Sequence, residues 1–134
     1  MFNLNTRILV VDDMMTMRKL VSKCLKDIGF TNISEAADGS IAWQDIMTTD
    51  NPYGLIVSDW NMPNCTGLDL LKRVRVSERH KTLPFVLVTA ESEQHQIVEA
   101  VKAGVSSYVI KPFTSAALKE KLEAVYLRTM TKAA

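Results

Sequence analysis

Three acids, a hydroxyl and an amine stand at the ends of short apolar segments of the chain; they are Asp12, Asp13, Asp59, Thr89 and Lys111. Carboxylates that lie together repel one another, and at neutral pH all three stay ionised only if a cation joins them. Oxygen ligands in a site open to water suit Mg²⁺, or Mn²⁺, better than zinc. A lysine beside them adds a point charge for an anion such as a phosphoryl group. An aspartate in that setting can act as a nucleophile toward phosphorus and form an aspartyl phosphate.

The apolar segments that precede these side chains have the composition of buried strands. Their apolarity is continuous rather than alternating, which is typical of strands covered on both faces of a parallel sheet. The segments are residues 8–11, 55–57, 85–88 and 108–110, with 33–36 a weaker fifth.

Helical patterns separate the predicted strands. In residues 17–28 the apolar side chains recur at steps of three and one, which places them on one stripe of a helix. Gly29 then ends this helix, and Gly104 ends the fourth. The stripe holds Met17, Leu20, Val21, Cys24, Leu25 and Ile28. The other predicted helices are 41–47, 68–74, 96–103 and 118–127.

Five strands that alternate with five helices predict a doubly wound α/β fold. In such a sheet the chemistry gathers at the carboxyl ends of the strands, so the acids, the threonine and the lysine should share one rim. No glycine-rich phosphate-binding motif follows the first strand, which excludes dinucleotide and P-loop sites. Neither His80 nor His95 ends a strand and the chain has no Cys-x-x-Cys, which argues against zinc.

Length and composition set the class of protein. The 134 residues are enough for one domain, 1–134 with a core of about 7–128, and leave no room for an output domain. Sixteen basic against fifteen acidic side chains give a net charge of +1, which disfavours DNA as a partner. Two cysteines are too few for a disulfide framework, and no apolar run is long enough to cross a membrane. We therefore expect a soluble, cytoplasmic protein.

The ordered motifs resemble those of the receiver domain of two-component response regulators, over almost the whole chain. Several longer stretches are similar to the CheY-like chemotaxis members of that family. The motifs are VVDD at 10–13, TMR at 16–18, SDWNMPN at 58–64, VTAE at 88–91, YVIKPFT at 108–114 and LKEKL at 118–122. The resemblance implies the receiver (flavodoxin-like) fold, with five parallel strands in the order 2-1-3-4-5.

The resemblance also assigns roles around the acids. Asp59 would be the phosphoacceptor, which takes a phosphoryl group from the phosphohistidine of a CheA-like sensor histidine kinase. Asp13, Asp59 and the main-chain carbonyl of Asn61 would bind Mg²⁺, and Asp12 would act largely through a metal-bound water. Asn61 and Glu91 would border the path of the water that hydrolyses the phosphoryl group.

Further roles fall on the fourth and fifth strands. By resemblance, Thr89, Ala90 and Lys111 would stabilise the phosphoryl group, and the Lys111–Pro112 peptide would be cis. Thr89 and Tyr108 would form the switch, in which movement of the threonine opens space for the aromatic ring.

The output face would include Ile97, Tyr108 and Lys121. Ile97 and Val98 are adjacent on a helix and lie about 100° apart, so both cannot point into the core. One of the two should therefore be left at the surface beside the tyrosine and the lysine.

Two stretches depart from the family pattern. Met14 and Met15 stand where CheY-like proteins often carry an aromatic and a small polar residue, which alters the shape of the rim. Cys65 and Thr66 replace a common Met-Asp pair, and the loop position of Cys65 predicts an exposed thiol. Thr66 can still begin the next helix by accepting a hydrogen bond from the N–H of Asp69, as in a capping box.

Three functions fit these residues. The first is a monomeric phosphorylation switch that binds the flagellar motor switch protein and is reset with or without a phosphatase partner. The second is an output-free receiver that serves as a phosphate sink or phosphorelay intermediate. The third, a phosphatase with an aspartate nucleophile, is disfavoured because such enzymes carry a second acid two residues after the nucleophile, where this chain has Asn61. We therefore expect self-phosphorylation and self-dephosphorylation rather than turnover of a substrate.

Overall fold

The computed structural model describes residues 1–90 and 95–133. Within them, strands and helices alternate along the chain as predicted; the bounds differ from the predicted ones by at most three residues, except that the last helix continues six residues past its predicted end at 127. The strands are β1 (Ile8–Val11), β2 (Ile33–Ala36), β3 (Leu55–Asp59), β4 (Phe85–Ala90) and β5 (Ser107–Lys111). The helices are α1 (Met15–Ile28), α2 (Gly39–Thr48), α3 (Gly67–Val76), α4 (Ile97–Lys102) and α5 (Ser115–Ala133).

The five strands form one parallel sheet in the order β2-β1-β3-β4-β5, which confirms the predicted doubly wound fold. The register pairs Val11 with Ser58, and Ala90 with Lys111. Asp59 pairs with Val88 in the same way. Because the strands are parallel and in this register, their carboxyl ends lie at one edge of the sheet.

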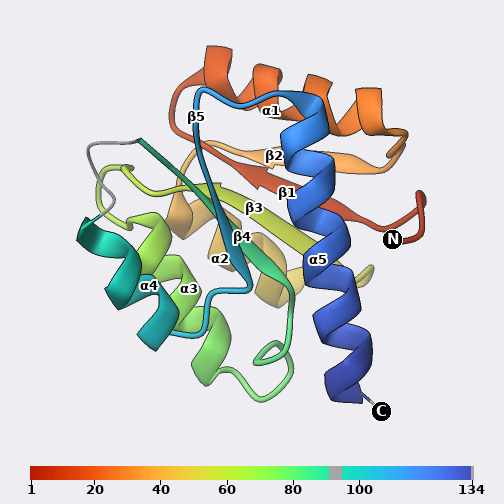
Figure 1. Cartoon of the computed structure of the whole chain (residues 1–134). Helices are drawn as coiled ribbons and strands as arrows, with labels where there is room; N and C mark the ends of the chain where they lie inside the picture. Colours follow the sequence, from red (N-terminus) through yellow and green to blue (C-terminus); the bar gives the residue numbers. More distant parts are fainter. Residues whose placement is uncertain (91–94, 134) are drawn as a thin grey trace.

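Helices cover both faces of the sheet, which explains the continuous apolarity of the strands (Figure 1). Leu9 and Val11 of β1 pack into the cluster beneath α2, α3 and α4, whereas Ile8 and Val10 pack into the cluster beneath α1 and α5. All four side chains are at most 1% exposed. Each such burial contributes about 1.5–3 kcal/mol to folding before the entropy cost, so the central strands provide a rigid frame for the residues at their ends.

The helix ends follow the predicted signals. Gly29 has φ +124° and its N–H donates to the Leu25 and Lys26 carbonyls, so it ends α1 as predicted. The α3 capping box is present, with hydrogen bonds of 3.1 Å in both directions between Thr66 and Asp69. No helix within residues 1–90 and 95–133 has both the length and the apolarity needed to cross a membrane.

One part of the predicted α1 stripe is wrong, because Leu20 is 48% exposed. Burial along α1 is centred on Val21 and Leu25, which face the sheet and α5. Leu20 lies about 100° around the helix from Val21, so it points away from this contact. A spacing pattern identifies the apolar side of a helix, but it does not show which residues of that side the neighbouring elements cover.

Candidate functional site

The three acids meet at the carboxyl edge of the sheet. Asp12 and Asp13 follow β1, Asp59 ends the neighbouring β3, and each offers a carboxylate oxygen within 4.8 Å of the others. Asp12 and Asp59 are 2% and 8% exposed, whereas Asp13 is exposed. A cluster with two buried acids and one acid open to water can hold a divalent cation that keeps several of its waters. The donors present are all oxygen, which fits Mg²⁺ or Mn²⁺.

Lys111 provides the positive charge of the site. Its Nζ lies 2.9 Å from Oδ1 of Asp59, as an ion pair in which the aspartate is mostly buried. Burial nevertheless raises the pKa of Asp59 above its ordinary value, against the opposing effects of the lysine and of the Trp60 backbone N–H. The ammonium of Lys111 therefore does not fully offset the desolvation of this carboxylate and the charge of Asp13 beside it.

Asp12 accepts hydrogen bonds from the Met14 backbone and from Arg18, which also forms an ion pair with Glu35. Its Oδ1 accepts a hydrogen bond of 2.9 Å from the Met14 N–H, which lowers the pKa of Asp12, but the larger effect of burial raises it. Nη1 of Arg18 donates to the Asp12 carbonyl at 2.9 Å, and Nε of Arg18 lies 3.0 Å from Oε1 of Glu35. Lys19 binds the other oxygen of the same glutamate at 3.0 Å.

Sequence reasoning missed this support for the acid cluster. Glu35 is the one charged residue within the five predicted strands, and a charge in a strand is a signal that a partner lies nearby. Its partners could not be inferred, because Arg18 and Lys19 fall between the apolar positions of α1, on the side of the helix expected to face water.

The structure places the predicted switch residues on neighbouring strands. Thr89 is 1% exposed and follows Val88, the residue paired with Asp59. Its Oγ1 donates to the Ala90 carbonyl at 3.3 Å. The Lys111–Pro112 peptide is cis, as predicted.

Two of the residues predicted for the output face, Tyr108 and Lys121, lie together beside the fifth strand. Tyr108 is half-buried, and Nζ of Lys121 lies 5.1 Å from the centre of its ring. Ile97 is also half-buried and Val98 is 60% exposed, so Val98 is the more exposed residue of that pair. Asn61 is exposed in the loop after β3, and Glu91 lies outside the described residues.

The expectation of an exposed Cys65 is wrong, since this residue is 2% exposed. The loop after β3 folds back so that the Gly67 N–H donates to the Trp60 carbonyl at 2.9 Å. This closure packs Cys65 against the start of α2, where a Cβ at Gly39 would lie 2.6 Å from the sulfur. Burial raises the pKa of the Cys65 thiol, which argues against a reactive thiolate.

Comparison with known proteins agrees with this geometry. Residues 8–123 match the response regulator receiver domain family. The chain belongs to this family. It is 50% identical to the chemotaxis protein CheY of Pseudomonas aeruginosa over 122 residues, which cover 91% of this chain and 97% of the relative. It is 48% identical to the chemotaxis protein CheY-3 of Vibrio cholerae over 126 residues, 94% of this chain and 95% of the relative.

The fold of this receiver domain is likewise shared with solved structures. The chemotaxis response regulator CheY4 of Vibrio cholerae superposes with a TM-score of 0.80 at 31% identity, over 90% of this chain and 98% of that one. The family and the curated relatives together make this a CheY-like receiver domain.

Gly67 lies against the backbone of β3 at Asp59. A Cβ at this position would overlap the Asp59 carbonyl oxygen and would lie 2.8 Å from Cδ2 of Leu87. We predict that Gly67→Ala lowers the free energy of unfolding by about 1–3 kcal/mol, as measured by urea denaturation. Gly54→Ala is the matched control, because its Cβ meets mainly the side-chain methyl of Thr6, which can move. Equal effects of the two substitutions would contradict the assigned close contact.

Proposed function

We propose that this receiver domain is a chemotaxis response regulator that a CheA-like sensor histidine kinase phosphorylates on Asp59. The observation that carries the proposal is the 2.9 Å pair between Asp59 and Lys111 beside the carboxylates of Asp12 and Asp13. The names of the relatives at 48–50% identity support the chemotaxis assignment.

In the transfer step, a carboxylate oxygen of Asp59 attacks the phosphorus of the donor phosphohistidine, and the P–N bond breaks. Asp13, Asp59 and the main-chain carbonyl of Asn61 would hold Mg²⁺, with Asp12 acting through a coordinated water. The metal ion, when bound, offsets the negative charge that builds up between donor and acceptor. Lys111 already lies at the acceptor oxygen, so it can follow the charge onto the new phosphoryl group without a large movement.

The signal leaves the site through the fourth and fifth strands. The hydroxyl of Thr89 and the backbone N–H of Ala90 can donate hydrogen bonds to a phosphoryl oxygen. The unmodified carboxylate of Asp59 provides no acceptor that reaches these two groups. Movement of Thr89 would then favour an inward position of the Tyr108 ring, which now lies half-buried beside Lys121. One local charge thereby biases a two-state element at the surface.

The output of this switch is binding of the phosphorylated form to the flagellar motor switch protein, through the face that includes Ile97, Tyr108 and Lys121. We propose a cytoplasmic monomer without DNA-binding activity. The domain is reset by hydrolysis of its own aspartyl phosphate, with or without a phosphatase partner, and does not turn over a separate substrate.

Capture of the motor switch protein tests this output. The domain is immobilised with Mg²⁺, in the presence or absence of beryllofluoride as an acyl-phosphate mimic, and is exposed to the purified switch protein. We expect binding only with the mimic, and none for Asp59→Asn under either condition. Phosphorylation without any switch-protein binding would instead identify a phosphate sink or relay intermediate.

Metal binding is expected to be weak, because a cation that keeps several waters has few protein ligands. Trp60 directly follows the ligand Asp59, so its fluorescence should change on titration with Mg²⁺. A Trp43→Phe background leaves Trp60 as the single tryptophan. The change should saturate in this background and disappear when Asp13→Asn is added. A signal that persists in Asp13→Asn would exclude this acid as a ligand.

The side chain of Asn61 should control the lifetime of the phosphoryl group. It is exposed, and two residues after the acceptor it would border the in-line path of an attacking water. We predict that Asn61→Arg lengthens the aspartyl phosphate lifetime several-fold, while Mg²⁺ still binds because the ligand at this position is the main-chain carbonyl. The measurement is the loss of phosphate after the donor is removed, with Asn32→Arg as an exposed control. A lifetime that is unchanged or shorter would show that water does not approach past Asn61.

A further inference from the structure

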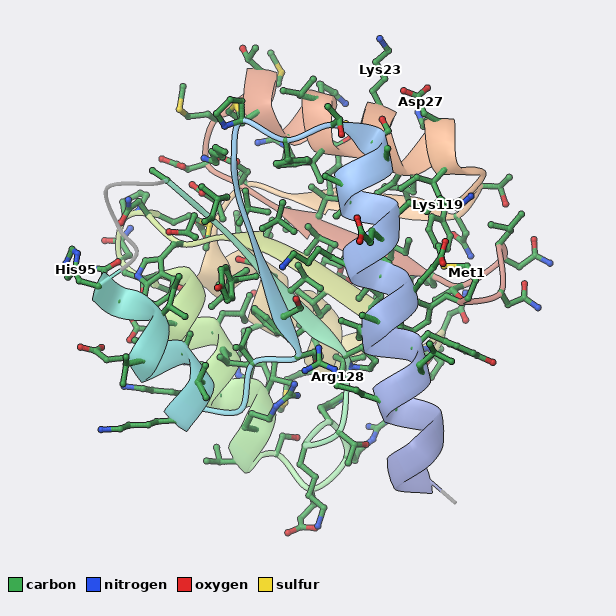
Figure 2. The ribbon with its side chains drawn as sticks, in the orientation of Figure 1. Met1, Lys23, Asp27, His95, Lys119 and Arg128 are labelled. Atoms are coloured by element: carbon green, nitrogen blue, oxygen red, sulfur yellow. The ribbon has the colours of Figure 1, made fainter. Side chains whose placement is uncertain are left out.

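A pocket lies at the opposite end of the sheet from the acids. Its volume is about 370 Å³, and its walls come from the end of α3, residues 81–82, the 104–106 turn before β5, and α5. Figure 2 shows Arg128 of α5 beside the start of β5, far along the strand from its carboxyl end. Nothing in the proposed phosphorylation chemistry uses this pocket.

The wall contributed by α3 holds a half-buried cation, Arg75, that has no acidic partner among residues 1–90 and 95–133. Nε and Nη1 of Arg75 donate to the Gly104 and Leu83 carbonyls at 2.8 and 2.6 Å, and Nη2 donates to Oγ of Ser106 at 3.4 Å. These bonds use three of the five guanidinium N–H groups and supply no negative charge. Burial lowers the pKa of Arg75, in keeping with a desolvated charge that lacks a counter-ion.

Two more cations face the same hollow. Arg128 donates from Nη2 to the Ser106 carbonyl, next to the hydroxyl that Arg75 contacts. Lys81 pairs with Glu78 at 3.2 Å, but both side chains are largely exposed, and such pairs hold their partners weakly. None of the described residues that line the pocket is acidic. Positive charge is therefore concentrated there without compensation from the walls.

We infer that this pocket binds a small organic anion. Its phosphate or carboxylate group would lie against Arg75, Arg128 and Lys81, where guanidinium groups favour planar, paired hydrogen bonds to oxygen anions. Its apolar part would lie on Val105 and Val125, which also line the hollow. The volume is within the range of pockets that enclose small molecules.

Phenyl phosphate is a suitable probe, since it combines a dianion with an apolar ring. The uniformly ¹⁵N-labelled full chain is titrated in the presence of EDTA, which removes divalent cations from the acid site. We expect saturable NMR shifts at the backbone amides of residues 104–106 and smaller shifts at residues 59–61. Benzoate distinguishes a carboxylate from a phosphate preference, inorganic phosphate removes the apolar part, and benzyl alcohol removes the charge. Binding of benzyl alcohol as tight as that of phenyl phosphate would overturn the inference.

Variants then assign the cations. Lys81→Gln and Arg128→Gln should each weaken phenyl phosphate binding by about fivefold, the upper range for a partly exposed ion pair. Lys119→Gln, an exposed cation on α5 outside the pocket, should leave the Kd unchanged (Figure 2). Arg75 is kept, because its bonds to two carbonyls hold the turn in place. Unsaturable shifts, or equal affinity of all three variants and the wild type, would refute the site.

Discussion

Asp59→Asn is expected to lower the rate of labelling by acetyl phosphate at least about a hundredfold, because it removes the oxygen anion that attacks phosphorus. The amide has nearly the shape of the carboxylate, so the packing of this 8%-exposed side chain should be preserved. The protein is incubated with labelled acetyl phosphate and Mg²⁺, and the label bound to it is then measured after denaturing electrophoresis. Circular dichroism checks that the variant is folded.

Asp50→Asn provides the matched control, since it removes an exposed acid outside the cluster and should label like the wild type. Undiminished labelling of Asp59→Asn would remove this residue from the role of acceptor. Slow labelling confined to that variant, traced to Asp13 by peptide mapping, would instead show a neighbouring acid acting once the preferred nucleophile is gone.

The sheet and the meeting of the acids could be predicted because both depend on local patterns. A run such as residues 8–11 is apolar at every position only when both faces are covered, and parallel strands bring their carboxyl ends together. These two patterns are enough to predict that Asp12, Asp59 and Lys111 share one rim of the sheet. The order of the strands came from the family resemblance, since a pattern within one strand does not name its neighbours.

Side-chain partners across elements could not be predicted in this way. Arg18 has the spacing of a wet helical residue, yet it bonds the Asp12 carbonyl and the carboxylate of Glu35 on β2. Cys65 sits in a loop, yet the close approach of α2 at Gly39 buries it. Each outcome depends on the distance between two packed elements. The spacing of residues along the sequence does not show a difference of a few ångströms in that distance.

The pocket beside Arg75 illustrates the same limit at the other end of the sheet. In sequence, this arginine is one of two basic residues in the last turn of α3. In the structure, it reaches the Gly104 and Leu83 carbonyls and becomes half-buried. Clusters of like charge that form only through tertiary contacts, as this one does with Arg128, are visible only after the helices are packed.

The acid cluster should make the metal-free receiver domain less stable as the pH rises. Burial is the largest cause that raises the pKa of both Asp12 and Asp59 in the folded state. A carboxyl group with a raised folded pKa stabilises the fold below its unfolded value, near 3.8, and this contribution is lost as the pH rises through the folded pKa. Other groups titrate as well, so the free energy of unfolding of the wild type is compared with that of Asp59→Asn at each pH. In EDTA, the free energy of unfolding of Asp59→Asn should increase relative to that of the wild type as the pH rises toward neutral.

Mg²⁺ should reverse this order. A cation between Asp13 and Asp59 favours the ionised carboxylates, so the stability gained from the metal grows with pH instead of falling. At a Mg²⁺ concentration 100 times the Kd obtained from Trp60 fluorescence, the free energy of unfolding of the wild type should rise by about 2.7 kcal/mol. Asp59→Asn should gain much less, because it loses one charged ligand, and at pH 7 the wild type should then be the more stable of the two. Urea denaturation at pH 5 and pH 7 measures the free energy of unfolding of both proteins. Each measurement is made with Mg²⁺ and with EDTA, at an ionic strength matched with NaCl. Equal Mg²⁺ stabilisation of both proteins would mean that the metal binds elsewhere, and the roles assigned to Asp13 and Asp59 would fail together.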